Sequence, residues 1–321
     1  MKTALVTGAT GYIGSVLCKH LQENDWKVIA LLRKPQSGPW DKHIVANLGN
    51  EPLPADTFHG IDVVFHLAAS SDNTDPSGIT ALDRKVNIEG TVDLLAASIK
   101  AGAKKLIYVS TVKAMGEGGE ECLDETSPVA PVSSYGRSKL AAEKLVLGQI
   151  DVPACVLRLP VVYGMSTQGN IAKMIRAILR HRFPPLPEMN NKRSMVHVKD
   201  VARAAELAAL ASSSTGQVFL VTDGQPYSTR QIYAWTCQMS GRQIPTWHLP
   251  PLMLRGIAMV SDTLGKVTGK PMPLDSFALN KLLGSAWYSN EKLRRVLGFR
   301  PEHSLQDSLP EIIRGVRESN D

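Results

Sequence analysis

The sequence predicts an α/β protein built on a doubly wound parallel sheet, with a smaller C-terminal α/β part. Three observations lead to this fold class. A short apolar run, Ala4 to Val6, stops at glycines spaced three residues apart, and apolar residues at helical spacing follow it. Apolar runs typical of buried parallel strands recur at 28–32, 61–69, 105–109, 154–159 and 217–221. Helical patterns separate most of these runs, and such alternation indicates a parallel sheet.

The glycines after the first strand have the spacing that binds the diphosphate of a dinucleotide. Gly8 permits a tight turn, Gly11 lets the backbone approach a pyrophosphate, and Gly14 lets the helix lie close to the sheet. The unpaired amides at the start of the helix then face the phosphates. Because strand, glycine turn and helix follow one another, we expect cofactor contacts from this segment. The residues concerned are Gly8, Thr10, Gly11, Tyr12, Ile13 and Gly14.

The residues after the second strand, 28–32, distinguish NAD from NADP. An acidic residue there binds a ribose 2′-hydroxyl and is typical of NAD, whereas this chain has Arg33 and Lys34. Two cations suit a 2′-phosphate, so we predict NADP, with NAD as the alternative. The opposing interpretation is that both are solvated loop charges.

Further cofactor contacts are predicted near the ends of later strands. After a weak third strand at 43–46, Asn47 and Leu48 are expected beside the adenine. The 61–69 run ends in small residues, which leave space for a ligand at the carboxyl end of a strand. The remaining predicted contacts are Leu67, Ala68, Ala69, Ser110, Tyr135, Lys139 and Pro160.

The stretch Ser134 to Lys139 carries the predicted chemistry. Tyr135 and Lys139 are four residues apart and share one face of a helix. A free tyrosine has a pKa of ~10 and is a poor base, but a neighbouring ammonium and an oxidised nicotinamide favour its phenolate. Tyr135 then takes a proton from an alcohol, or returns one to a ketone, while Thr111 holds the substrate oxygen. Asn87, within a helix predicted at 81–101, either bonds nearby backbone or anchors the catalytic region.

Composition excludes several other classes. The chain has 321 residues, 43% of them hydrophobic, as expected for one large or two interlocked globular domains. The net charge of +6 is scattered among acids, which disfavours a nucleic-acid partner. No signal peptide and no apolar run of membrane-spanning length is present, so a cytoplasmic protein without a membrane span is expected. The cysteines lack metal-ligand spacing, and no metal site is predicted: Cys18, Cys122, Cys155 and Cys237.

Two domains are predicted. Residues 1–163, completed by about 195–222, form the cofactor-binding part, and residues 164–194 with 223–321 form the substrate-binding part. The apolar stretch Trp247 to Val260 is interpreted as packing or dimer surface, because Arg255 interrupts it.

In combination, these residues resemble the extended short-chain dehydrogenase/reductases, the NAD(P)-dependent epimerase/dehydratase family. The matching segments are Thr7 to Gly14, His66 to Ala69, Asn87, Ser110 with Thr111, Tyr135 with Lys139, Arg158 to Gly164, and Arg193 to Val201. The resemblance implies a Rossmann-type domain of about seven parallel strands, and a homodimer formed through the helices at 81–101 and 134–149. It also implies that Thr111, Tyr135 and Lys139 form the catalytic triad, supported by Asn87.

A finer pattern is similar to the bacterial UDP-sugar 4-epimerases and 4-ketoreductases. The pattern has five segments: Gly169-Asn170, Pro185-Leu186-Pro187, Arg193-Ser194, Leu283-Gly284-Ser285 and Leu297 to Pro301. The resemblance implies that Asn170 and Arg193 contact the diphosphate of a nucleotide sugar, with Ser70, Thr111 and Lys113 as further substrate contacts. Sugar dehydratases of this family have Asp-Glu after the catalytic threonine, where this chain has Val112 and Lys113. Dehydration is therefore not expected.

Several functions stay open at the level of sequence. The first two are a 4-epimerase that retains NAD and a UDP-4-keto-sugar reductase that consumes NADPH. A third is an NADPH-dependent reductase of an apolar ketone, of the hydroxysteroid or dihydroflavonol type. A non-enzymatic alternative is an NADP-binding redox sensor, which the presence of Tyr135 and Lys139 argues against.

Overall fold

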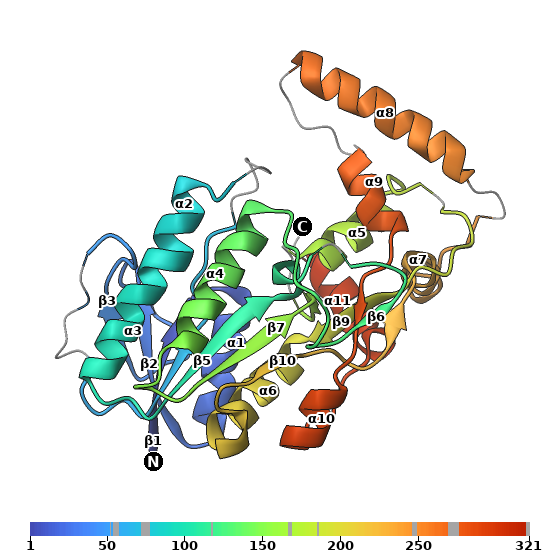
Figure 1. The fold of residues 1–321 in the computed structure, drawn as a ribbon. Helices are drawn as coiled ribbons and strands as arrows, with labels where there is room; N and C mark the ends of the chain where they lie inside the picture. Colours follow the sequence, from blue (N-terminus) through green and yellow to red (C-terminus); the bar gives the residue numbers. More distant parts are fainter. Residues whose placement is uncertain are drawn as a thin grey trace.

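The centre of the molecule is a seven-stranded parallel sheet in the order β10-β7-β5-β4-β1-β2-β3 (Figure 1). The computed structural model describes residues 1–51, 53, 58–71, 78–116, 118–165, 169–184, 186–245, 249–268 and 276–318. The seven strands are β1 (Lys2–Thr7), β2 (Trp26–Leu32), β3 (Lys42–Val45), β4 (Val63–His66), β5 (Lys105–Thr111), β7 (Ala154–Leu159) and β10 (Val218–Leu220). The chain runs outward from β1 to β3 and then returns to β4 on the other side of β1. In such sheets, ligands bind at the carboxyl ends of the strands at this reversal.

Helices cover both faces of the sheet, so the fold is doubly wound as predicted. On one face, α1 (Tyr12–Glu23) and α6 (Val198–Leu210) pack against alternate strand residues such as Ala4 and Val6. On the other face, α3 (Gly90–Lys100) and α4 (Ser134–Gly148) pack against Leu5 and its neighbours. Strand residues alternate between the two faces, which is why one apolar run serves both cores.

The predicted elements are found, with one difference in the helix expected at 81–101. The structure divides it into α2 (Ala81–Asp83), a π-helix η2 (Arg84–Glu89) and α3. Single π-helical turns inside α-helices are frequent at functional sites, and this one contains Asn87. Short 3-10 turns lie at η3 (Val112–Ala114) and η4 (Ser212–Ser214).

The later part of the chain builds two small sheets beside the main one. β8 (Val161–Tyr163), β9 (Arg193–His197) and β11 (Pro226–Tyr227) form one, and β6 (Cys122–Leu123) pairs with β12 (Trp287–Tyr288) in the other. Apolar residues of β8 and β9 pack against α5, α7 and α11. The remaining helices are α5 (Asn170–Leu179), α7 (Thr229–Met239), α8 (Pro251–Thr268), α9 (Ser276–Leu283), α10 (Glu291–Leu297) and α11 (Leu305–Glu318). The proposed division into two domains stays a prediction.

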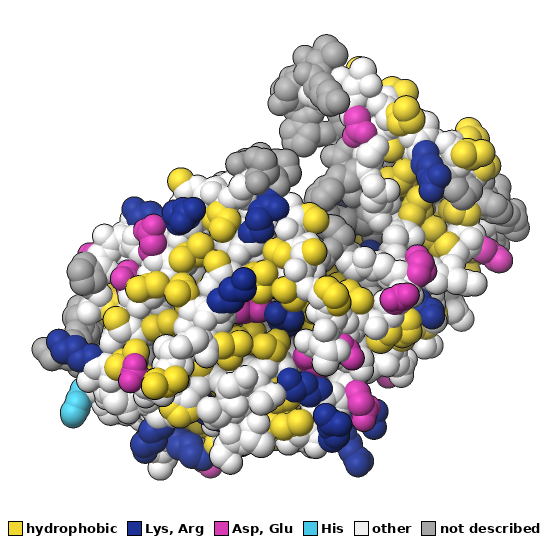
Figure 2. Space-filling view, viewed as in Figure 1, with side chains coloured by type: hydrophobic (Ala, Val, Ile, Leu, Met, Phe, Trp, Pro, Cys, Tyr) yellow, Lys and Arg dark blue, Asp and Glu magenta, His cyan; other side chains and the backbone are white. Residues whose placement is uncertain are grey.

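Helix α8 projects from the body (Figure 1), and apolar side chains are visible on it in the space-filling view (Figure 2). Leu254 and Ala258 are buried against Leu186 and Leu279, which agrees with a packing role. Other apolar side chains of the helix are exposed, with Leu252 at 78% and Met259 at 68%. Trp247, at the start of the predicted stretch, lies outside the described residues. Within the described part of the chain, no helix combines the length and apolarity needed to span a membrane.

Candidate active site

The glycine turn between β1 and α1 forms a cradle that only glycine fits. Gly8 has a φ of +69°, and a Cβ there would lie 2.8 Å from the amide nitrogen of Ala68. A Cβ on Gly14 would lie 2.8 Å from the carbonyl carbon of Gly8 and would collide with its oxygen. The turn after β1 therefore lies close to the segment after β4 on one side and to the start of α1 on the other. This open, amide-rich turn fits the diphosphate of a dinucleotide.

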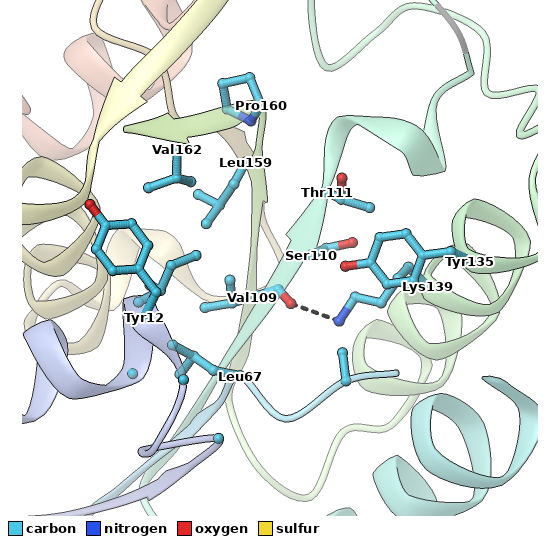
Figure 3. A pocket seen from close by; sticks show the side chains of 15 residues that line it. Tyr12, Leu67, Val109, Ser110, Thr111, Tyr135, Lys139, Leu159, Pro160 and Val162 are labelled. Carbon is cyan, nitrogen blue, oxygen red and sulfur yellow. Dashed lines mark hydrogen bonds between the residues drawn. The ribbon is translucent and has the colours of Figure 1, made fainter. Parts of the chain in front are cut away.

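A cavity of about 320 Å³ extends from this cradle to the end of β5 (Figure 3). Twelve of the predicted site residues line it: Gly8, Gly11, Tyr12, Ile13, Gly14, Leu67, Ala69, Ser110, Thr111, Tyr135, Lys139 and Pro160. In the close view, the Tyr135 hydroxyl points into the cavity beside Ser110, and Thr111 lies at its rim. The Tyr135 hydroxyl, predicted to exchange the proton, and the glycine cradle thus share one cavity.

Lys139 lines this cavity and is held in place by β5. Its side chain is 1% exposed. The Nζ atom donates to the carbonyl oxygen of Val109 at 2.8 Å and lies 4.0 Å from the centre of the Tyr108 ring. The Tyr135 hydroxyl and the Lys139 amine therefore occupy neighbouring positions on the same helical face, as the four-residue spacing predicted.

The protein's own groups do not make Tyr135 a base. Burial raises the pKa of Tyr135 to about 12, and the carboxylate of Asp83 adds to this effect. Burial also lowers the pKa of Lys139 to about 7, although Glu143 acts in the opposite direction. Both groups are desolvated, so burial opposes ionisation of Tyr135 in the protein by itself; that the ammonium and an oxidised nicotinamide together favour the phenolate stays a prediction.

The end of β4 is organised by a buried histidine rather than by a catalytic one. His66 Nδ1 lies 2.8 Å from Thr7 Oγ1, and its Nε2 lies 3.0 Å from Thr91 Oγ1. Burial lowers the pKa of His66 to about 3, and the charge of Lys139 contributes. Thr7 Oγ1 also accepts the amides of Leu67 and Ala68. This histidine is a packed strand residue with both ring nitrogens next to hydroxyl groups.

Asn87 connects three segments around the site. Its Oδ1 accepts the backbone amide of Ser70 at 2.8 Å, and its Nδ2 donates to the Ser70 carbonyl at 2.9 Å. The same Nδ2 donates to Ser138 Oγ, between Tyr135 and Lys139 on α4. Of the two alternatives considered above, the contacts favour an anchor for the catalytic region over a local backbone bond.

The other predicted residues do not line the cavity. Thr10, Arg33, Lys34, Asn47 and Asn170 are exposed, whereas Leu48 is buried in the core. Ala68 and Ser70 belong to the loop after β4, and Lys113 Nζ lies 5.7 Å from the centre of the Tyr135 ring. Arg193 begins β9, where its guanidinium donates to the carbonyl oxygen of Gly284 at 3.0 Å. Their roles toward cofactor or substrate stay predictions.

Sequence reasoning missed several residues that complete the site. Val109, Leu159 and Val162 line the cavity. Ser134 Oγ donates to the buried carboxylate of Asp83 at 2.6 Å, which fixes the start of α4. Glu143, four residues after Lys139, forms a buried ion pair with Arg158 of β7. The helical spacing alone would have placed Glu143 on the catalytic face.

One group of possible metal ligands lies elsewhere among the described residues. His197, Asp200 and His303 have ligand atoms within 4.8 Å of one another. The two imidazole rings are stacked, with centres 4.1 Å apart. Asp200 already accepts from Arg203 and from the amides of Glu302 and His303. Stacked rings and an occupied carboxylate do not favour a shared ion, but the expectation of no metal stays a prediction.

Comparisons with known proteins concern the chain as a whole. The model of the NAD dependent epimerase/dehydratase family matches residues 4–221. A UDP-glucose 4-epimerase of Vibrio cholerae is 28% identical over 99% of this chain and 97% of its own length. A 3-beta-hydroxysteroid dehydrogenase of Mycolicibacterium neoaurum is 27% identical over 96% of this chain and 90% of its own length.

Among solved structures, MoeE5 in complex with UDP-glucose and NAD is similar over 99% of this chain and 100% of its own. Its TM-score is 0.76 and its identity is 26%. These matches identify an NAD-dependent enzyme of the short-chain dehydrogenase/reductase type, rather than the redox sensor considered above.

Proposed function

Because the chain belongs to the NAD dependent epimerase/dehydratase family, we propose that it transfers hydride at C4 of a nucleotide sugar. The reaction is that of a UDP-hexose or UDP-N-acetylhexosamine 4-epimerase, or of a UDP-4-keto-sugar reductase. The observation that carries this proposal is the Tyr135 hydroxyl in one cavity with the glycine cradle. Two relatives support the substrate class: a UDP-glucose 4-epimerase and a protein solved with UDP-glucose and NAD. Both are similar to this chain over 99% of its length.

In this proposal, each residue has a defined task. The hydroxyl of Thr111 orients the sugar oxygen, and Tyr135 removes its proton or returns it. The nicotinamide supplies the hydride acceptor and donor, and its positive charge in the oxidised form favours the phenolate of Tyr135. Lys139 adds a second positive charge when protonated. Asn87 and Val109 hold these groups in position.

We propose NAD as the cofactor, with NADP as the alternative. The solved relative holds NAD. The argument for NADP rests on Arg33 and Lys34, two exposed cations directly after β2. Replacing both by alanine should weaken NADP binding about tenfold or more if they clasp a 2′-phosphate, and should leave NAD binding unchanged. Isothermal titration with both dinucleotides decides between them.

The nucleotide-sugar proposal has a direct test. Purified protein is incubated with UDP-glucose or UDP-N-acetylglucosamine and NAD, and with a UDP-4-keto sugar and NADH or NADPH. Epimerised sugar, or loss of reduced-cofactor absorbance, is expected; Tyr135→Phe should reduce either rate by ~10²–10⁴. Tyr233→Phe, on α7, is the matched control and should leave the rate unchanged. No conversion of any of these substrates would contradict the proposal.

The alternative substrate is an apolar ketone or alcohol. The hydroxysteroid dehydrogenase relative favours it. Arg193 and Asn170 separate the two proposals, because contacts to a diphosphate have no task on a sterol. Arg193→Ala should impair turnover of a UDP-sugar and spare an apolar ketone. Because this change also removes a bond to Gly284, the melting temperature is measured alongside the rates.

A further inference from the structure

Beneath the catalytic face of α4 lies a buried polar network that the proposed reaction does not yet use. Tyr135, Lys139 and Glu143 follow at four-residue intervals, so they share one face of the helix. The Glu143 carboxylate is 2% exposed and Arg158 is 5% exposed. The two form an ion pair that is almost completely removed from water.

Arg158 grips this carboxylate with two nitrogens. Its Nε lies 3.1 Å from Oε1 and 3.2 Å from Oε2, and its Nη2 lies 2.7 Å from Oε2. Ser110 Oγ also donates to Oε1. A guanidinium remains charged in proteins, and both oxygens of this carboxylate accept hydrogen bonds from it. The Glu143 carboxylate is therefore held in a fixed position on α4, four residues after Lys139.

The network also joins the three elements that frame the cavity. Glu143 lies on α4, Ser110 on β5 and Arg158 on β7, and Ser110 and Arg158 are paired in the sheet register. Thr111 directly follows Ser110, and Pro160 lies two residues after Arg158; both line the cavity. A change at Glu143 can therefore affect both Thr111, the predicted substrate contact, and Pro160, the predicted nicotinamide contact.

We propose that Glu143 is a positioning residue of the reaction: clamped by Arg158 and Ser110 one helical turn from Lys139, it favours the protonated form of the Lys139 amine beside Tyr135. This inference rests on the proposed hydride transfer. Few other charges face the amine within the described part of the chain. Burial lowers the pKa of Lys139, and Glu143 is the group that raises it. The amine otherwise meets a carbonyl and the Tyr108 ring.

The remaining titratable groups around the pair do not replace Glu143. Tyr108, under the amine, has a pKa well above its usual value because it is buried, and it remains neutral. His66 of β4 also remains neutral at working pH, since burial lowers its pKa to about 3. Asp83 of α2 acts on Tyr135, where it opposes ionisation. Arg158 is itself positive and is offset only by Glu143.

The test compares Glu143→Gln, which keeps the shape and removes the charge, with Glu143→Asp, which keeps the charge. In Glu143→Gln, the rising limb of the pH–rate profile for alcohol oxidation should move upward by about one pH unit, with kcat reduced and the cofactor KM nearly unchanged. Glu143→Asp should return the profile toward that of the wild type. Ultraviolet titration of tyrosinate in the NAD⁺ complex, with Tyr135→Phe subtracted, should show the same upward shift without any substrate.

Folding is controlled separately, because Glu143→Gln leaves Arg158 buried and unpaired. The double variant Glu143→Gln/Arg158→Gln leaves no charge unpaired and should show the same shift. Asp200→Asn removes a buried carboxylate on the opposite sheet face; it should lower the melting temperature and leave the pH–rate profile in place.

A folded Glu143→Gln protein with an unmoved pH–rate profile and an unmoved tyrosinate titration would overturn the proposal. Failure of both Gln variants to fold would also overturn it, since the pair would then be purely structural. If the wild type converts no substrate, the proposed function fails, while the tyrosinate titration still decides the role of Glu143.

Discussion

At the scale of single residues, Lys139 combines a charged amine with nearly complete removal from water. Its partners are a backbone carbonyl and an aromatic face rather than a carboxylate in direct contact. The pKa of Lys139 falls from 10.5 to about 7 as a result. A buried amine of this kind makes the folded state less stable than a neutral side chain would.

The pH dependence of stability should report this directly. Between pH 7 and pH 10.5 the unfolded chain binds the proton that folded Lys139 has lost, so stability rises with pH over this window. The wild type should have a smaller free energy of unfolding than Lys139→Met at pH 7. This difference should decrease by on the order of 4 kcal/mol between pH 7 and pH 10. Urea unfolding of both proteins across this range measures the difference. Lys144→Met, at an exposed position on the same helix, is the control. If the stability difference from the wild type is independent of pH for both variants, the low pKa of Lys139 is contradicted.

At the scale of elements, the glycine turn and the Tyr135–Lys139 helix were predictable because each is a local pattern. Gly8, Gly11 and Gly14 lie within one strand-turn-helix unit, and Tyr135 and Lys139, the predicted catalytic pair, lie four residues apart on one helix. The π-helix at Arg84–Glu89 was not predictable. Its contacts reach from Asn87 to Ser70 and Ser138, which are distant in sequence, and apolar periodicity carries no sign of them.

The same reasoning explains which site residues were missed. Val109 contributes through its backbone carbonyl, so its side-chain type gives no signal. Arg158 of β7 meets Glu143 because α4 packs across both β5 and β7. A sequence motif indicates the local structure of one segment, whereas these contacts depend on how separate segments pack together. The fold class was predictable from the alternation of strands and helices, but the side-chain contacts between distant segments were not.

The glycine cradle gives a prediction for an element as a whole. In Gly14→Ala, the new Cβ meets the carbonyl group of Gly8, so α1 must shift away from the turn. We expect a destabilisation of ~1–3 kcal/mol and weaker dinucleotide binding, since the amides no longer face the phosphates. Gly148→Ala is the control, because a Cβ there meets nothing within 4 Å. Thermal unfolding and dinucleotide titration measure both effects; unchanged affinity in a folded Gly14→Ala protein would show that the cradle does not hold the cofactor.

At the scale of the whole molecule, the early and late parts of the chain are joined next to the site. β12 pairs with β6, which lies in the loop after the catalytic strand β5. Trp287 Nε1 donates to the carbonyl oxygen of Glu120 at 3.0 Å, and Ser285 Oγ donates to Glu120 Oε2 at 3.0 Å. Arg193, the predicted diphosphate contact, is bonded to Gly284 in the same late segment. A ligand that contacts both parts should therefore stabilise both of them against unfolding.

Ligand-induced stabilisation tests this connection. A dinucleotide at 100 times its Kd should stabilise the chain by about 2.7 kcal/mol, provided that it binds only the folded state. If the two parts unfold together, calorimetry shows one transition, and the dinucleotide and a UDP-sugar each move all of it upward. Arg193→Ala should remove the shift caused by the UDP-sugar and retain the shift caused by the dinucleotide, because Arg193 does not line the cavity below the glycine cradle. Two transitions, of which the dinucleotide moves only one, would show that the β6–β12 pairing does not couple the parts, and that cofactor and substrate are held by units that fold independently.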